Sequence, residues 1–527
     1  MTPAALLLAA SVMGYVLQIG TGAPISKATV TLSPFNGGTS ASYTATTSTD
    51  GRFSFQNINP GEYRLSATRN GFVRIEYGAG QPNRPGLPIT VRDGQELTDI
   101  KLQMTPAGTI AGRVFDRDGE PLANVSVVAL KNSYQGGMRA LNAVETARTN
   151  DLGEYRLFWL QPGQYFVSAT PEPNLEDVAY RGEGYIPAYY PGATDPQSAT
   201  SINLQPGMVF TGVDMTVAPV PTLRIQGEAI NGLTGQPVRS ASIMRFPVRG
   251  TPVLRNRPIA PISVNEDGRF MLRDVVPGSY ELIATSGEGK NRLRARVLVN
   301  VGNADVQSVS LLMVPGVTLT GSITIDGPSS GSAAQDLQQM RVMLRPDPIT
   351  QSAESPPGSP VGPTGTFTFQ DVAYDDYRLT VSGMPENAYV KLARYGGKNV
   401  LDEGLRIDRQ PNERFEIVVS RNSGNVTGSV QNDKLEPSAN VTVILIPDLP
   451  RRARLDLYRM ATTDAMGRFH IEGVPPGDYR AFSWEDIETG AWQDPEFIRN
   501  FEDRGNPVRV NENGTSNIQL RVIRPQV

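Results

Sequence analysis

The sequence contains no cysteine and one histidine, His470. Without cysteine the chain can form no disulfide, no thiol nucleophile and no thiolate metal site, so its domains must be held together by packing alone. A single histidine also leaves no second imidazole to share a zinc site or a catalytic pair. Because His470 alternates with Phe469 and Ile471, it is predicted to lie exposed on a strand. No metal or cofactor is expected.

The sequence also lacks an excess of charge and a long apolar run. Its 49 basic and 53 acidic residues give a net charge of −4, without the basic stripe that nucleic-acid binding requires. No segment is long enough for a transmembrane span. The apolar run from Ala4 to Met13 has the length of a signal-peptide core, but no basic residue precedes it. Residues 1–11 are therefore predicted to be a truncated signal segment or the approach to a first strand.

One motif is abundant. TDGRFSFQNINPGEYRL, residues 49–65, returns four times at intervals of about 100 residues, which is the usual size of a domain. Each copy has a turn glycine followed twelve positions later by a tyrosine. The pairs are Gly51 and Tyr63, Gly153 and Tyr165, Gly268 and Tyr280, Gly365 and Tyr377, and Gly467 and Tyr479.

Each copy predicts two strands joined by a corner. Asp50-Gly51 is typical of a hairpin, because glycine adopts positive φ without a steric clash, and Phe53 and Phe55 then alternate toward the core. Pro60-Gly61 favours a chain reversal. The tyrosine that follows matches a tyrosine corner, whose hydroxyl bonds to upstream backbone. We predict this structural role for Tyr63, Tyr165, Tyr280, Tyr377 and Tyr479, although the fourth copy has Tyr374-Asp375 in place of Pro-Gly.

A second motif opens each copy. GYVLQIGTGAPISKATVTL, from Gly14, predicts two strands with Val16, Ile25, Val30 and Leu32 buried. Similar openings start at Gly112, Gly227, Gly321 and Gly428, the one at Gly321 being degenerate with its second strand at Met340–Leu344. We therefore predict an all-β chain of five tandem Greek-key sandwiches. They are repeat one (12–106), repeat two (107–220), repeat three (221–315), repeat four (316–421) and repeat five (422–527).

The two motifs together resemble the carboxypeptidase regulatory-like domain. The resemblance covers nearly the whole chain and is weakest in repeat four. It implies a transthyretin-like (prealbumin-like) seven-stranded sandwich, similar to the Cna-type B repeats of collagen adhesins and to starch-binding-like folds. It also implies an accessory domain of exported bacterial proteins without catalytic residues of its own. The glutamate that promotes isopeptide bonds in B-type repeats is replaced here by Ala67, Ala169, Ala284, Val381 and Ser483, so no such crosslink is expected.

Two insertions exceed what the sandwich needs. In repeat two, Tyr180, Tyr185, Tyr189 and Tyr190 gather on one loop and are candidates to stack on sugar rings or on a partner protein; the alternative is that they cap the sandwich. In repeat five, Trp484 and Trp492 flank a predicted helix, Pro495–Glu502, with Asp494 as its N-cap and Phe497, Ile498 and Phe501 on one face. Both tryptophans are candidate ligand contacts, although packing across the sandwich is the default.

The charged residues are weaker candidates for a functional site than these aromatic ones. Asp116-Arg117-Asp118-Gly119 resembles half of a calcium loop but lacks the downstream ligands, which favours a polar turn. Glu485, Asp486 and Glu488 could imitate a hydrolase pair, but acidic residues in this setting more often solvate a loop. Arg451, Arg452 and Arg454 are predicted to form a solvated loop.

The predicted function is a non-catalytic exported or cell-envelope protein for binding and scaffolding. Matched cores with varied loops provide length and display, as a stalk or an accessory binding array requires. The expected partner is a polysaccharide or another envelope protein. Carbohydrate binding, a purely structural or protein-binding adhesin role, and the less favoured carboxylate-based hydrolase all remain open at this point.

Overall fold

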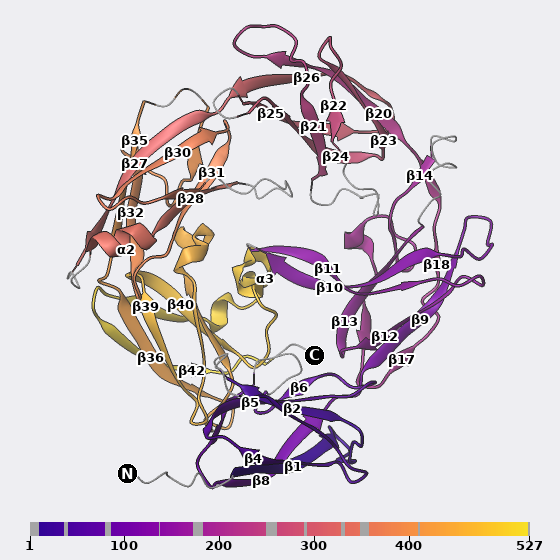
Figure 1. Cartoon of the computed structure of the whole chain (residues 1–527), viewed down its shortest axis with the longest axis vertical. Coiled ribbons are helices and arrows are strands. Elements are labelled where there is room, and N and C mark those ends of the chain that lie inside the picture. Colours follow the sequence, from indigo (N-terminus) through magenta and orange to yellow (C-terminus); the bar gives the residue numbers. More distant parts are fainter. Residues whose placement is uncertain are drawn as a thin grey trace, which may run out of the picture. The chain divides into compact units, whose positions relative to one another are not determined.

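A computed structural model describes residues 10–35, 41–79, 86–135, 137–171, 183–248, 261–288, 292–327, 333–347, 358–408, 410 and 412–524. These residues form mainly strands (Figure 1), which confirms the all-β sandwich class. The chain divides into two compact units. One consists of Met1–Lys131, Asn142–Asn174 and Tyr185–Pro219, and the other of Asn132–Leu141, Leu175–Gly184 and Val220–Val527. The boundaries of five separate domains stay a prediction.

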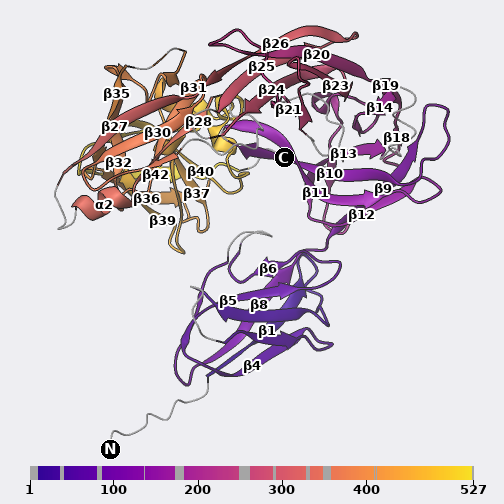
Figure 2. The same ribbon diagram turned by 45° about the horizontal axis from the view of Figure 1, so that its top comes forward.

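Repeat one, in the first unit, has two sheets that share one core. One sheet has the order β4-β1-β8, and the other has β3-β2-β5-β6 with β7 also paired to β5 (Figure 2). The predicted core residues Val16, Ile25, Val30, Leu32, Phe53 and Phe55 are at most 5% exposed, which confirms the alternation. The strands are β1 Ala10–Gln18, β2 Thr29–Pro34, β3 Tyr43–Thr46, β4 Arg52–Ile58, β5 Gly61–Thr68, β6 Ile75–Glu76, β7 Ile89–Val91 and β8 Glu96–Met104.

Repeat two has the same plan with longer strands. Its sheets have the orders β12-β9-β17, with β18 on β9, and β11-β10-β13-β15, with β16 on β13; β14 pairs with β19. The elements are β9 Gly108–Phe115, β10 Val125–Gln135, β11 Met138–Arg148, β12 Glu154–Leu160, β13 Gly163–Pro171, β14 Glu183–Tyr185, β15 Ala188–Tyr189, η1 Pro196–Ser198, β16 Ile202–Leu204, β17 Val209–Phe210, β18 Met215–Thr216 and β19 Pro219–Pro221.

Repeat three, in the second unit, is one continuous sheet of order β22-β21-β24-β25-β26-β20-β23. The continuity arises because β25 pairs along β24 and also reaches β26 at Leu293 and Arg294. The strands are β20 Leu223–Asn231, β21 Ser242–Pro247, β22 Ile262–Ser263, β23 Arg269–Val275, β24 Gly278–Ser286, β25 Leu293–Val301 and β26 Val306–Pro315.

Repeat four has sheets of order β30-β27-β35-β32-β33 and β29-β28-β31-β34. Strand β28 overlaps the predicted second strand, Met340–Leu344, but begins one residue later and ends at Pro346. The elements are β27 Val317–Asp326, α2 Ala333–Gln339, β28 Arg341–Pro346, β29 Gly358–Pro360, β30 Thr366–Val372, β31 Asp376–Ser382, β32 Tyr389–Tyr395, β33 Lys398–Asn399, β34 Leu405–Arg406 and β35 Arg414–Ser420.

Repeat five has sheets of order β39-β36-β42 and β38-β37-β40-β41. Its strands are β36 Gly424–Gln431, β37 Thr442–Pro447, β38 Arg459–Thr462, β39 Arg468–Val474, β40 Gly477–Trp484, β41 Asn506–Val510 and β42 Thr515–Arg521. Its helical turns are η3 Arg451–Ala453, η4 Leu455–Leu457, η5 Ala491–Gln493, α3 Pro495–Arg499 and η6 Glu502–Arg504.

The tyrosine hydroxyl in each repeat donates to the backbone carbonyl four residues upstream. The bonds are Tyr63 to Asn59 at 2.8 Å, Tyr165 to Gln161 at 2.7 Å, Tyr280 to Val276 at 2.8 Å, Tyr377 to Ala373 at 2.9 Å and Tyr479 to Pro475 at 2.7 Å. The bond therefore forms in repeat four as well, where the Pro-Gly turn is missing. It depends on a backbone carbonyl, which any residue supplies.

The opening glycine of repeats one, two, three and five is explained by a close backbone approach, whereas Gly321 of repeat four lies against the side chains of Phe367 and Phe415. A Cβ on Gly14 would lie 2.1 Å from the carbonyl oxygen of Ile100, and one on Gly428 would lie 2.0 Å from that of Ile518. In both cases the contact comes from the last strand of the same repeat, which runs parallel to the first. The glycine thus allows the two strands to pair without a steric clash.

Two predictions about local structure need correction. The helix α2 was not expected, although its sequence AAQDLQQ consists mostly of good helix formers. The predicted helix Pro495–Glu502 ends at Arg499, and η6 begins at Glu502. In addition, Ala10 and Ser11, assigned to the signal segment, belong to β1, where Ala10 pairs with Ile58. The rest of that segment lies outside the described residues.

Candidate functional site

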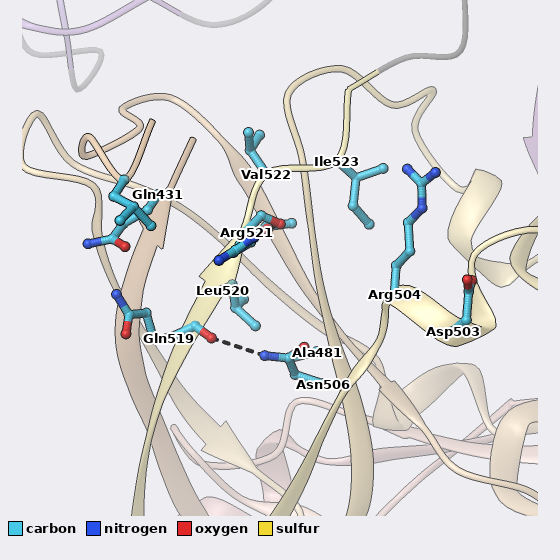
Figure 3. Close-up of a pocket in the computed structure, with 12 residues that line it drawn as sticks. Gln431, Ala481, Asp503, Arg504, Asn506, Gln519, Leu520, Arg521, Val522 and Ile523 are labelled. Atoms are coloured by element: carbon cyan, nitrogen blue, oxygen red, sulfur yellow. Dashed lines mark hydrogen bonds between the residues drawn. The ribbon is translucent and has the colours of Figure 1, made fainter. Parts of the chain in front are cut away.

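Repeat five borders two pockets. The first, here called the edge pocket, lies beside β42 and has a volume of about 520 Å³. Figure 3 shows the side chains of Asn506, Gln519 and Arg521 around it, from β41 and β42, with Arg504 on its far side. Strand β42 is the last strand of its sheet, so its outer edge faces this pocket.

Polar side chains already occupy the edge of β42. The amide Nδ2 of Asn506 donates to the carbonyl of Gln519 at 3.0 Å (Figure 3), and Ser483 Oγ donates to the carbonyl of Arg521 at 2.8 Å. Such side-chain bonds satisfy backbone acceptors that would otherwise be open to another strand. The edge pocket is therefore the weaker ligand site of the two.

The second pocket, here called the arginine pocket, lies between repeats four and five and has a volume of about 380 Å³. Both repeats belong to the second compact unit. Repeat four contributes charged side chains to its lining, and repeat five contributes ring-bearing residues together with Arg452 and Asp494. The lining residues that matter below are Arg345, Asp347, Arg378, Arg452, Tyr458 and Trp492.

Two of its arginines face each other on neighbouring strands. Arg345 of β28 is directly opposite Arg378 of β31 in the register, an arrangement that is repulsive unless the charges are neutralised. Arg378 is neutralised: its Nε donates to Asp347 Oδ2 at 2.7 Å, and its Nη1 donates to the carbonyl of Asp402 at 3.0 Å. The Nε of Arg345 is buried and has no hydrogen-bond partner in the described chain.

The third arginine, Arg452, is bound by a carboxylate. Its Nη2 lies 3.0 Å from Glu502 Oε2, and its Nη1 also donates to Oε1, so the pair is bidentate. This hydrogen bonding raises the pKa of Arg452 and lowers the pKa of Glu502. Two of the three arginines therefore have their own counter-ion, and among the described residues Arg345 has none.

The ring-bearing residues of the pocket come from repeat five. Trp492 lies in η5, and Asp494 caps α3 by accepting from the backbone N–H of Glu496 at 2.8 Å, as the sequence predicts. The hydroxyl of Tyr458 donates to the carbonyl of Arg452 at 3.0 Å. Burial raises the pKa of Tyr458 to about 12, so this tyrosine stays neutral at ordinary pH.

Of the two predicted tryptophan contacts, the structure brings only Trp492 to a pocket. Trp484 is 2% exposed and stacks on Phe482, with ring centroids 5.1 Å apart. It belongs to an apolar cluster with Ile444, Ile446, Ile498 and Phe501. The proposed ligand contact at Trp484 was therefore wrong, because α3 and η5 cover its ring.

The tyrosine loop of repeat two is only partly described. Tyr180 lies outside the described residues. Tyr185 and Tyr189 are half-buried in β14 and β15, and Tyr190 packs against the core of repeat two. Tyr190 thus fits the alternative of a ring that caps the sandwich, and a ligand role for Tyr185 and Tyr189 stays a hypothesis.

The arginine cluster is not a solvated loop. Arg454 is 6% exposed and binds Asp456, with Nη2 to Oδ2 at 2.6 Å, and Asp402 of repeat four, with Nη1 to Oδ1 at 3.6 Å. Arg451 Nη1 donates to the carbonyl of Pro476. Burial opposes the charge of Arg454, but the hydrogen bonds and negative charges of Asp456 and Asp402 together outweigh it, so the pKa of Arg454 is raised. The correction arises because repeat four packs against this segment.

The remaining candidates have no catalytic geometry in the described chain. His470 is 52% exposed, with Nδ1 3.7 Å from Glu472 Oε1. Asp116 Oδ1 accepts from the backbone N–H groups of Asp118 and Glu120, which forms a polar turn. Glu485 and Glu488 are exposed, and no cluster of metal-ligating side chains occurs among the described residues. The longest helix among the described residues, α2, has seven residues, and no helix in this part of the chain could cross a bilayer.

The arginine pocket was missed at the sequence level. Arg345, Arg378 and Arg452 are far apart in the chain, and nothing in their local patterns links them. The one available signal was Arg345 itself, a charged residue at the position before the strand proline, where repeats three and five have Phe246 and Ile446.

Residues 11–105 and 109–206 match the family model of the carboxypeptidase regulatory-like domain. Among curated proteins, Colossin-A of Dictyostelium discoideum is 21% identical over 393 residues, which are 68% of this chain and 3% of that protein. The BOS complex subunit NOMO3 of Homo sapiens is 24% identical over 226 residues, 40% of this chain and 17% of that protein. The chain thus spans a small part of the length of these relatives.

Pilins are among the solved structures that match parts of this chain. A streptococcal ancillary pilin is 14% identical and covers 58% of this chain and 98% of its own, with a TM-score of 0.25. BcpA, the major pilin subunit of Bacillus cereus, is 12% identical and covers 58% and 99%, with a TM-score of 0.16. TM-scores this low support no inference about function.

Proposed function

We propose, from the premise that this chain carries carboxypeptidase regulatory-like domains in tandem, that it is a non-catalytic binding and scaffold protein of the exported or cell-envelope type. The regular part of each repeat is used for packing, and the variation lies in insertions. Loops on a rigid sandwich are where binding sites usually arise. The relatives are consistent with a multidomain scaffold, and no enzymatic family is among them.

Carbohydrate is the proposed ligand, and the arginine pocket is the proposed site. The observation that carries this proposal is the pairing of Trp492 and Tyr458 with a pocket of about 380 Å³, within the usual size range of small-ligand sites. Aromatic faces provide apolar contact for the C–H groups of a sugar, while neighbouring polar groups bind its hydroxyls. The half-buried Tyr185 and Tyr189 form a second candidate surface.

A glycan array on the full chain tests this function. Binding that is lost in Trp492→Ala, and kept in a Tyr185, Tyr189 and Tyr190 triple alanine variant, supports the arginine pocket. Binding lost in the triple variant alone moves the site to repeat two. Absence of binding to every glycan leaves the structural or protein-binding role as the better account. Thermal unfolding of each variant separates lost binding from lost folding.

A hydrolase that uses carboxylates alone is the competing function. Turnover of glycan, ester or peptide substrates by the purified chain, abolished by Glu485→Gln or Asp486→Asn, would overturn the non-catalytic assignment. Fractionation of cells that express the full-length protein tests the proposed exported location.

A further inference from the structure

We propose that the arginine pocket selects an acidic glycan, and that Arg345 binds the carboxylate of a uronic-acid residue. This inference rests on the proposed carbohydrate function and narrows its ligand class. It follows from the charge balance of the pocket, from the place of Arg345 in the sheet, and from the rings that line the same pocket.

Among the three arginines that line the pocket, Arg345 has no ion pair within the described chain; Asp494, which also lines the pocket, accepts from the backbone N–H of Glu496. Arg378 has Asp347, and Arg452 has Glu502. The Nε of Arg345 is buried, and the described chain offers it no acceptor. Buried polar groups are normally hydrogen-bonded, and one that is not costs free energy until a ligand or water binds it. A carboxylate suits a guanidinium best, because its two oxygens accept two parallel N–H bonds.

The sheet itself does not require an arginine at this position. Repeats four and five align through Pro346, which pairs with Tyr377, and Pro447, which pairs with Tyr479. Each proline is preceded by the residue in question, Arg345 in repeat four and the fully buried Ile446 in repeat five. An apolar side chain is thus compatible with this strand position. The arginine therefore places a charge in the pocket that the packing of the strand does not require.

The ring-bearing residues of the pocket favour a sugar over a peptide carboxylate. The half-buried Tyr458 and Trp492, which is 7% exposed, line the same pocket as Arg345. A pyranose ring with a carboxylate at one end matches this combination, because it has an apolar face and a charged end.

The test is calorimetric titration of the full chain with two matched probes, an oligogalacturonate and the neutral galactose oligomer of the same length. We expect the acidic oligomer to bind more tightly. Arg345→Gln should weaken the acidic oligomer by roughly tenfold or more, the scale of a lost hydrogen bond to a charged group, and leave the neutral one unchanged. Arg345→Lys should restore part of the loss, because an ammonium keeps the charge without the two parallel donors.

Arg341→Gln is the matched control, since Arg341 is exposed on the same strand and does not line the pocket. Two outcomes would overturn the inference and keep the carbohydrate function. One is equal binding of both oligomers. The other is binding of the acidic oligomer that Trp492→Ala abolishes and Arg345→Gln leaves intact. No binding of either oligomer, or of any array glycan, would overturn both. Binding of a peptide with a free C-terminal carboxylate, without glycan binding, would also overturn the proposal. Unfolding curves verify that each variant is folded.

Discussion

Repeats four and five have the same strand plan and place their additional chain differently. In repeat four the addition extends a sheet: β32 pairs with the outer edge of β35, from Tyr389 opposite Ser420 to Tyr395 opposite Phe415. In repeat five the equivalent strand β42 has no strand on that edge within the described chain. There the additional chain forms η5, α3 and η6, which pack on the other sheet.

The residues on that second sheet explain the difference. At four equivalent positions repeat five has large apolar side chains that form the base of a cluster under α3, whereas repeat four has smaller, polar or flexible ones. The positions are Ile444, Ile446, Phe482 and Trp484 in repeat five, and Met343, Arg345, Thr380 and Ser382 in repeat four. The tyrosine corner and the strand order remain the same. The inner face thus fixes the sandwich, and the outer face decides what packs on it.

The largest expected effect comes from removing the cluster that repeat four lacks. Trp484→Ala should destabilise repeat five by about 3–5 kcal/mol, because a fully buried tryptophan leaves a large cavity. The equivalent change in repeat four, Ser382→Ala, should stay within about 0.5 kcal/mol, since Ser382 is exposed. Denaturant unfolding of the full chain measures both. Similar losses at the two positions would mean that α3 is not packed on the sheet.

The next effect concerns the ion pairs that join the two repeats. Arg454→Gln should cost roughly 2 kcal/mol, less than a fully buried pair, because Asp456 and Asp402 are each more than 40% exposed. Asp402→Asn removes only the contact to repeat four and should cost less. If repeats four and five unfold in separate transitions after Arg454→Gln and in one transition before it, Arg454 couples them. An unchanged unfolding curve would contradict the ion-pair account.

A smaller effect tests what the two repeats share. Tyr479→Phe and Tyr377→Phe should each cost about 1 kcal/mol, the scale of one buried hydrogen bond. The pKa of Tyr479, raised to about 12 by burial, agrees with a hydroxyl removed from water. The two losses should be similar even though the acceptors belong to Pro475 and Ala373. A loss of stability from Tyr479→Phe alone would show that the tyrosine hydrogen bond of repeat four contributes nothing to its stability. The two repeats would then differ in their tyrosine corners as well.

The smallest effect is the pH dependence that belongs to repeat five. Glu502 has a lowered pKa because Arg452 hydrogen-bonds its charged form. The carboxylate of Glu502 therefore binds a proton more readily in the unfolded chain than in the folded one. Its ion pair stabilises the fold fully above the pKa of Glu502 in the unfolded chain, about 4.3. This stabilisation is lost as the pH falls through the lower pKa of the folded state. Glu502→Gln should reduce the slope of stability against pH below about 4.3. Urea unfolding at a series of pH values measures the slope, and a slope that Glu502→Gln leaves unchanged would contradict the ion-pair account.

Local motifs predicted most of the fold. Gly51 and Tyr63 recur with constant spacing, and the alternation of Phe53 and Phe55 identified a core strand because a half-buried strand has a period of two. The N-cap at Asp494 followed from local chemistry as well. These features depend on neighbouring residues and therefore appear in the sequence.

The candidate site could not be predicted in the same way. Trp484 and Trp492 looked equivalent in the sequence, yet one is covered by α3 and the other lines a pocket. The burial of Arg454 depends on Asp402 in another repeat, and the isolation of Arg345 depends on which carboxylates its neighbours bind. Such relations are set by tertiary packing. Periodicity and spacing do not encode them.

The parallel pairing of the first and last strands also determines how a repeat responds to tension. In repeat five, β36 and β42 lie side by side and run in the same direction, from Asn425 opposite Thr515 to Gln431 opposite Arg521. A pull on the two ends of the repeat therefore acts along the strands in opposite senses and strains the whole ladder of hydrogen bonds at once. A hairpin pulled from its open end would instead yield one bond at a time. The hydrogen-bond geometry of such a repeat consequently resists extension along the line between its two ends.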